Sequence, residues 1–211
     1  TSRALRDRHP GCTTWAIRRP DGSAFVGATP ELLVRLEGRA VTSGALAGTA
    51  PRSPDPRVDT QLARQLLDQA KERHEHAVVV DAIRAGLATV SDDVTVAAAP
   101  VIRRLPDVQH LETPIAATLR EGHTLWDLVA ALHPTPAVGG QPRAAALDWL
   151  AAHEDLDRGW YAAPIGWVDG RGDGAFHVAL RSAFLRGGRA WAYAGAGLVA
   201  GSDADAEWSE T

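Results

Sequence analysis

The stretch "WYAAPIGWVDGRGDGAFHVALRSAFLRGGRAWAYAGAG", residues 160–197, decides the fold class. Apolar runs alternate there with the short turns "GRGDG" and "RGGR", whose glycines suit the backbone angles of tight turns. Strands joined by such short turns are antiparallel, because a parallel connection needs a dozen or more residues. The same reasoning predicts a β-meander over residues 13–42, built from "TTWAIRR", "AFVGA", "ELLVRL" and "AVTS".

The middle of the chain has a helical pattern. Over residues 58–90 apolar residues recur at spacings of three and four, with no proline and no glycine before Gly86, which predicts one long helix. A length of 211 residues suits a single α/β or α+β unit rather than two domains. We further expect a strand at 94–100, a polar connection at 105–113, helices at 124–132 and 143–153, and a last helix capped by Ser202 or Asp203.

Composition excludes several classes of protein. The net charge of -4 argues against nucleic acid or an anionic membrane as a partner, and no apolar run approaches the roughly 20 residues of a membrane helix. The single cysteine cannot form an internal disulfide, and no charged-then-apolar signal segment opens the chain, which favours a cytoplasmic protein. Because methionine is absent, Thr1 is not a genetic start, and we expect a fragment or a processed chain.

The stretch "KERHEH", residues 71–76, raises the question of a metal site. His74 and His76 are two residues apart, which on a helix separates them by about 200° around the axis, so they do not share one zinc ion. Lys71, the only lysine of the chain, is interpreted as an ordinary residue of the helix.

Two pairs of glutamates have a spacing that suits a hard cation. Glu72 and Glu75 lie three apart and therefore on one helical stripe, and Glu207 and Glu210 repeat this spacing in "EWSE". Carboxylates without a thiolate favour Mg²⁺ over zinc. Two alternatives stay open: the first pair can belong to a solvated, salt-bridged helix face, and the second can simply complement a helix N-terminus.

Four further residues are candidates with competing explanations. Arg181, within "HVALRSAFL", is expected to point inward and to need an anion, which can be a ligand or a structural carboxylate. Gly195 and Gly197 can expose backbone N–H groups to a carboxylate or only permit a bulge. Glu31 follows Pro30 at a strand start, where a surface glutamate without function is common.

Read in order, "GATPELL", "ALAGTA", "KERHEH", "HPTPAVGG", "RGWYAAPIGW", "VALRSA" and "YAGAGLVAGSDADAEWSET" resemble the chorismate-utilising enzymes. Within that family the sequence is most similar to the isochorismate synthases. The resemblance implies an α+β fold in which antiparallel sheets pack face to face with helices outside. It makes residues 1–211 the C-terminal part of a single chorismate-binding catalytic domain, incomplete at both ends.

The resemblance also implies roles for the candidate residues, with chorismate as substrate and Mg²⁺ as cofactor. Glu31 matches the general acid that protonates the departing 4-hydroxyl as water adds at C2. The metal positions are the principal pair Glu75 and Glu210 and the supporting pair Glu72 and Glu207. The substrate-binding positions are Gly48, Thr49, His110, Ala137, Tyr161, Arg181 and Gly195.

Two features qualify the implied activity. Ala137 in "HPTPAVGG" favours isochorismate synthase, because the aminating and pyruvate-releasing relatives tend to carry threonine there. The family's base is a lysine upstream of the Glu31 motif, for which this chain has no candidate, so we expect the 211 residues to be inactive alone. A salicylate synthase, an anthranilate synthase and a non-catalytic remnant remain alternatives. Menaquinone and siderophore pathways both fit, and the length allows a monomer.

Overall fold

The computed structural model describes residues 2–210, except for the side chain of Glu210. Within this range the strands form two antiparallel sheets. The smaller sheet has the order β1 (Thr13–Arg18), β2 (Ala24–Thr29), β10 (Ser182–Arg186) and β11 (Arg189–Tyr193). The larger sheet has the order β5 (Ser91–Val96), β7 (Val108–Leu119), β4 (Ala40–Pro51), β3 (Leu32–Glu37), β9 (Gly174–Val178) and β8 (Pro164–Val168), with β6 (Val101–Arg104) paired to β7.

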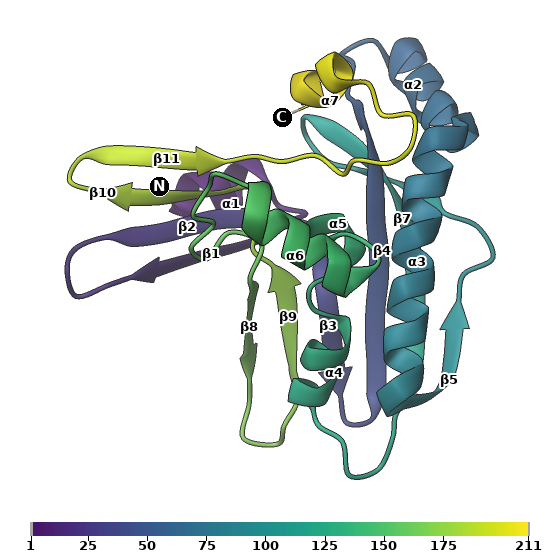
Figure 1. The fold of residues 1–211 in the computed structure, drawn as a ribbon, viewed down its shortest axis with the longest axis vertical. Coiled ribbons are helices and arrows are strands. Elements are labelled where there is room, and N and C mark those ends of the chain that lie inside the picture. The colour runs from purple at the N-terminus through teal and green to yellow at the C-terminus, as the bar shows by residue number, and fades with distance from the viewer. Residues whose placement is uncertain (1, 211) are drawn as a thin grey trace.

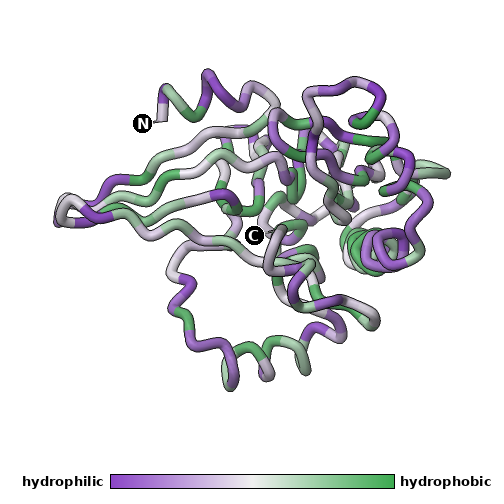
Figure 2. The backbone as a smooth tube through the Cα atoms, turned by 90° about the horizontal axis from the view of Figure 1, so that it is seen from above, coloured by the Kyte–Doolittle hydropathy of each residue, from purple (hydrophilic) through white to green (hydrophobic). Residues whose placement is uncertain are grey.

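Helices lie against the larger sheet, and the smaller sheet projects from its side (Figure 1). Seen from above, the four strands of the smaller sheet run out together away from the rest of the molecule (Figure 2). The predicted α+β class with antiparallel sheets is confirmed. The helices are α1 (Ser2–Arg8), α2 (Pro56–Asp68), α3 (Ala70–Val90), α4 (Leu125–Leu132), α5 (Pro136–Gly139), α6 (Arg143–His153) and α7 (Ala204–Glu210).

The main hydrophobic core lies between the larger sheet and the helices α3 and α4. Helix α3 contributes Val79, Ile83 and Leu87 to this core at spacings of four, which is typical of one buried helical face. The predicted helices at 124–132 and 143–153 are confirmed as α4 and α6, and the last helix is confirmed as α7. In the described part of the chain no helix has both the length and the apolar character that crossing a bilayer requires.

The prediction of one helix over residues 58–90 is wrong, because the chain breaks at Gln69. This residue has an extended backbone (φ -66°, ψ 122°) and caps the end of α2 and the start of α3. The two helices serve different cores: Leu66 of α2 packs with Ala50 and Leu111 in a second, smaller cluster, whereas α3 covers the main one. Tertiary packing therefore redirects a segment whose local sequence contains no helix breaker.

The predicted polar connection at 105–113 is also wrong in its second half, which belongs to β7. This twelve-residue strand pairs with β4, β5 and β6. Gln109, His110 and Thr113 are buried in it, and each forms hydrogen bonds with neighbouring elements. Polar side chains that are satisfied by hydrogen bonds can occupy a central strand, and hydropathy does not reveal them.

The segment "AFHVALRSAFL" does not form one strand. It is β9 in the larger sheet, then a break at residues 179–181, then β10 in the smaller sheet. Arg181 adopts the left-handed backbone region (φ 49°), so the chain turns at the residue that the sequence placed inside a strand. The connection from β2 to β3 makes the same passage between the sheets, through Pro30 and Glu31.

Truncation of one core residue tests the packing of α3. Leu87 is fully buried, so we expect Leu87→Ala to lower the free energy of unfolding by about 3 kcal/mol. Urea unfolding of both proteins measures the difference. Leu198→Ala is the matched control because Leu198 is 73% exposed, and its effect should stay within about 0.5 kcal/mol. Equal effects of the two substitutions would contradict this description of the core.

Candidate functional site

Glu31 and Arg181 lie where the chain passes from one sheet to the other. The backbone N–H of Val178 donates to the carbonyl of Glu31 at 3.1 Å, and the N–H of Ala28 donates to the carbonyl of Arg181 at 3.2 Å. Arg181 and Ala162 are two of the three non-glycine residues with positive φ among those described. Such conformations are costly and are concentrated at functional sites. The crossing between the sheets therefore positions two of the predicted site residues.

Glu31 is buried, with 6% of its surface exposed. The alternative of a surface glutamate is therefore wrong. Burial raises the pKa of the carboxyl to about 7, and the positive charge of Arg181 opposes this rise only in part. A carboxyl with this pKa is substantially protonated near neutral pH and can donate a proton to a leaving group.

A chain of hydrogen bonds runs from Arg181 to strand β4. The guanidinium Nη2 lies 2.6 Å from His110 Nε2, and His110 Nδ1 lies 3.2 Å from the carbonyl of Gly48 and 3.1 Å from Thr49 Oγ1. An arginine can only donate, so Nε2 accepts and Nδ1 carries the proton. Burial and the charge of Arg181 lower the pKa of His110 to about 4, which agrees with a neutral ring. At this contact the arginine thus meets a neutral acceptor and keeps its full charge.

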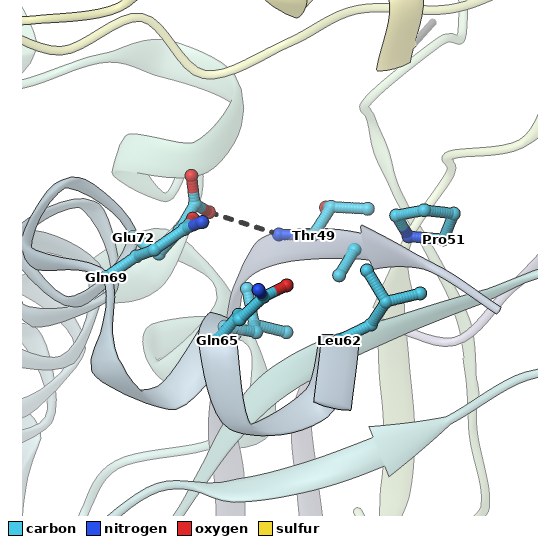
Figure 3. Close-up of a pocket in the computed structure, with 8 residues that line it drawn as sticks. Thr49, Pro51, Leu62, Gln65, Gln69 and Glu72 are labelled. Carbon is cyan, nitrogen blue, oxygen red and sulfur yellow. Dashed lines mark hydrogen bonds between the residues drawn. The ribbon is translucent and has the colours of Figure 1, made fainter. Parts of the chain in front are cut away.

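A bulge in β4 sets the positions of Gly48 and Thr49, two of the predicted substrate-binding residues. The register against β7 shifts between Ala47 and Thr49, which makes Gly48 the extra residue, with φ 77°. The N–H of Thr49 then donates to Glu72 Oε2 at 3.2 Å (Figure 3). A Cβ on Gly48 would lie 3.1 Å from the same oxygen, so glycine is required by space as well as by conformation.

Glu72 and Glu207 are both buried and share one cation. Their exposed fractions are 4% and 5%, and Lys71 Nζ lies 3.2 Å from Glu72 Oε1 and 2.6 Å from Glu207 Oε1. Burial acts to raise the pKa of Glu207, but hydrogen bonds from Lys71 and Ser202 outweigh it and leave the pKa lowered. The alternative of a solvated helix face is wrong for Glu72, and Lys71 is more than an ordinary helix residue. The side chain of Glu210 lies outside the described part of the structure.

The glycine-rich segment after β11 runs close to two other predicted residues. A Cβ on Gly195 would lie 3.0 Å from the Tyr161 hydroxyl, and one on Gly197 would lie 2.6 Å from Glu75 Oε1. Tyr161 also stacks on Tyr193 with the ring centroids 5.3 Å apart. The segment thus lacks side chains where it passes Tyr161 and Glu75. The sequence offered Gly195 and Gly197 together as candidates, but the resemblance gave a substrate-binding role to Gly195 alone and did not indicate that Gly197 lies against Glu75.

The histidines of "KERHEH" are not arranged as ligands of one ion. His76 is buried and bonds to the carbonyl of Ala47 at 3.3 Å and to Thr113 Oγ1 at 2.6 Å, whereas His74 is exposed. Among the side chains that the structure describes, no three His, Cys, Asp or Glu residues come close enough together to hold a metal ion. A magnesium site formed by Glu72, Glu75, Glu207 and Glu210 therefore stays a prediction, and the side chain of Glu210 lies outside the described part of the structure.

Ala137 and a cavity beside α2 complete the description of the predicted residues. Ala137, in α5, packs against the main core. A cavity of about 200 Å³ lies between α2 and the end of β4, and Figure 3 shows Glu72 and Gln69 at one side of it and Pro51 and Leu62 at the other. Of the predicted residues, Thr49 and Glu72 line this cavity.

The arrangement of these groups has features that are typical of catalytic sites. The guanidinium of Arg181, through the neutral ring of His110, and the carboxylate of Glu72 both connect to Gly48 and Thr49 of β4, and the buried, protonatable carboxyl of Glu31 lies within the electrostatic influence of Arg181. Such perturbed, convergent groups are typical of catalytic sites.

Comparison with known proteins supplies the family. The family model described as "Chorismate binding enzyme" matches residues 1–211, the whole chain, and the protein therefore belongs to this family of chorismate-binding enzymes. The resemblance seen in the sequence is confirmed.

Several relatives are isochorismate synthases by name. The "Salicylate biosynthesis isochorismate synthase" of Pseudomonas aeruginosa is 50% identical over 207 residues, which cover 98% of this chain and 43% of that protein. "Isochorismate synthase MenF" of Bacillus subtilis is 41% identical over 209 residues, covering 99% and 44%. The chain thus spans about half the length of the curated relatives it matches.

A solved structure agrees. That of the putative 2,3-dihydroxybenzoate-specific isochorismate synthase DhbC from Bacillus anthracis matches with a TM-score of 0.95 and 37% identity, covering all of this chain and 57% of the other. The fold described here therefore corresponds to part of a larger enzyme structure.

The buried carboxyl of Glu31 predicts a pH-dependent stability. Because its pKa is raised from 4.5 to about 7 in the folded state, its contribution to stability is complete below pH 4.5 and is lost as the pH rises through about 7. The loss amounts to about 3 kcal/mol. We therefore expect Glu31→Gln to gain stability relative to the unmodified protein between pH 5 and pH 8, as measured by urea unfolding at both values.

The matched control lies on the same strand. Glu37 is exposed at the end of β3, so Glu37→Gln should show no such gain. If the stability of Glu31→Gln followed that of the unmodified protein at both pH values, the raised pKa would be refuted.

Proposed function

We propose that this chain is the C-terminal part of the chorismate-binding catalytic domain of an isochorismate synthase. The reaction is the Mg²⁺-dependent isomerisation of chorismate, in which the hydroxyl is moved from C4 to C2. The observation that carries the proposal is the buried Glu31, whose pKa of about 7 suits a general acid at neutral pH. The names of the relatives, which include isochorismate synthases of salicylate and menaquinone biosynthesis, support the same assignment.

Proton donation by Glu31 drives departure of the 4-hydroxyl. Water adds at C2, the double bond shifts, and the C4–O bond breaks while Glu31 transfers its proton to the leaving oxygen. Glu31 then returns to the protonated form by taking up a proton from solvent. Since Lys71 is ion-paired with two carboxylates, we infer that the base that accepts a proton from the attacking water belongs to the longer protein.

Arg181 orients the substrate through a carboxylate. Its guanidinium contacts the neutral ring of His110, so its charge remains directed at an anion, and a bidentate pair with a carboxylate is the strong form of such contacts. Tyr161 and the backbone at Gly195 adjoin one another, and we assign both to substrate binding. His110, Gly48 and Thr49 hold the arrangement through β4.

The acidic side chains offer the kind of donor atom, carboxylate oxygen, that suits a magnesium ion. Glu72 and Glu207 already gather around one cationic atom, Lys71 Nζ, and Glu75, three residues after Glu72 on α3, lies against Gly197. Oxygen donors without thiolates are those that Mg²⁺ prefers. We assign the principal positions to Glu75 and Glu210 and the supporting positions to Glu72 and Glu207. When bound, the ion would supply positive charge for a carboxylate of the substrate.

Activity of the full-length protein tests this function. We expect chorismate and Mg²⁺ to give isochorismate, separated by chromatography, and Glu31→Gln to lower kcat by about 10²- to 10⁴-fold because the proton donor is lost. The conservative control Glu37→Gln should retain full activity, since Glu37 is exposed at the far end of β3.

The products decide between the alternatives. Salicylate would assign the protein to the pyruvate-releasing relatives, and anthranilate formed with ammonia would assign it to the aminating ones, one of which is 37% identical over 211 residues. A full-length protein that folds but turns over none of these would be a non-catalytic member of the family. Isomerisation by the 211 residues alone would contradict the inferred need for a base elsewhere.

Gly197 provides a separate test of the metal positions. A Cβ there would lie 2.6 Å from Glu75 Oε1, so in Gly197→Ala the carboxylate has to move. We expect Mg²⁺ affinity, measured by calorimetry on the full-length protein, to fall about tenfold, which corresponds to about 1.4 kcal/mol. Gly170→Ala is the control, because nothing lies within 4 Å of its Cβ position. Unchanged affinity in Gly197→Ala would remove Glu75 from the proposed site.

A further inference from the structure

Lys71 occupies a position that a helix does not favour. It is the second residue of α3, in the first turn, where the helix dipole disfavours a positive charge. It is also the only lysine among 211 residues, and its side chain is 28% exposed. Its placement is explained by what it contacts, two buried carboxylates from different elements.

The first contact ties Lys71 to the larger sheet. Lys71 Nζ lies 3.2 Å from Glu72 Oε1, and the other oxygen of Glu72 accepts the N–H of Thr49 at 3.2 Å. Glu72 is therefore fixed from two sides, by the bulge of β4 and by the lysine. Through Glu72, the ammonium group of Lys71 is held against the larger sheet.

The second contact ties Lys71 to α7. Lys71 Nζ lies 2.6 Å from Glu207 Oε1, and Glu207 is the one buried side chain among residues 204–209, whereas Trp208 is 81% exposed. A helix of seven residues does not form by itself in water, so α7 depends on its attachment to the body of the protein. The ion pair with Lys71 attaches the buried side chain of α7 to α3.

We propose that Lys71 is a positioning residue that docks α7 onto α3 before any metal ion binds. It does so by bridging Glu72 and Glu207, the supporting members of the two glutamate pairs. Docking brings the principal members, Glu75 on α3 and Glu210 at the end of α7, to the same region. The part that concerns the metal ion rests on the proposed function, whereas the docking of α7 does not.

Hydrogen exchange of the full-length protein without metal measures the docking directly. In Lys71→Met, which keeps the aliphatic length but removes the charge, we expect the amides of α7 to exchange at least tenfold faster than in the unmodified protein. Lys71→Arg should restore the protection, because a guanidinium can bridge two carboxylates. Arg84→Met is the matched control: Arg84 lies on the same helix in an exposed pair with Asp81 and should leave α7 unchanged.

A double substitution identifies the partner. Glu207→Gln should speed exchange of α7 as Lys71→Met does, and the combined variant should add little, since both remove the same interaction. Full additivity of the two effects, or unchanged exchange of α7 in Lys71→Met, would overturn the docking. The global free energy of unfolding, measured for each variant, separates local undocking from a general loss of stability.

Mg²⁺ binding, measured by calorimetry, tests the positioning role. We expect Mg²⁺ to bind about tenfold more weakly to Lys71→Met, because part of the binding free energy must then be spent on ordering α7. Binding to Lys71→Arg should be normal. Tighter binding in Lys71→Met would show that the ammonium competes with the ion, and equal binding would show that Lys71 does not affect the metal site. Either result would overturn the positioning role. If the unmodified protein bound no Mg²⁺, the proposed function would fail, and the exchange data would still decide the docking.

Discussion

The bulge at Gly48 is the constraint on which the site depends. One extra residue in β4 turns two adjacent backbone groups out of the ladder with β7, the carbonyl of Gly48 toward His110 and the N–H of Thr49 toward Glu72. A bulge costs ladder hydrogen bonds, and here those groups find side-chain partners. One local irregularity thus holds both the neutral histidine that supports Arg181 and the carboxylate that supports Lys71.

Strained backbone and a buried carboxyl occur together where the chain crosses between the two sheets. Arg181 and Ala162 have left-handed backbones, and Glu31 is buried with a raised pKa. Each feature is unfavourable alone and persists because two sheets meet there and fix the backbone by hydrogen bonds to Val178 and Ala28. A more relaxed crossing would let Glu31 reach water, and its pKa would return to the ordinary value at which it is no proton donor near neutral pH.

The sequence predicts the periodic elements and fails where polar groups or tertiary packing decide. Hairpins with glycine turns and the amphipathic α3, α4 and α6 follow from local pattern. The strand β7 was missed because its buried Gln109, His110 and Thr113 read as a loop, and the break at Gln69 because both flanking segments favour helix. The spacing argument on "KERHEH" drew attention to Glu72, which the structure shows to be buried, but it could not show that Lys71 lies between Glu72 and a glutamate more than a hundred residues away.

Buried charge is compensated on the acidic side of the site but not on the basic side. On the acidic side, Lys71 compensates two buried carboxylates, which without it would carry the desolvation penalty of unpaired charges. On the basic side, Arg181 is given a neutral imidazole, which holds the guanidinium by a hydrogen bond without compensating its charge. A protonated His110 would repel Arg181, and a carboxylate in its place would compete with an anionic ligand. The lowered pKa of His110 therefore leaves the charge of Arg181 uncompensated at neutral pH, and the raised pKa of Glu31 leaves that carboxyl substantially protonated, as the proposed reaction requires of an anion-binding residue and a proton donor.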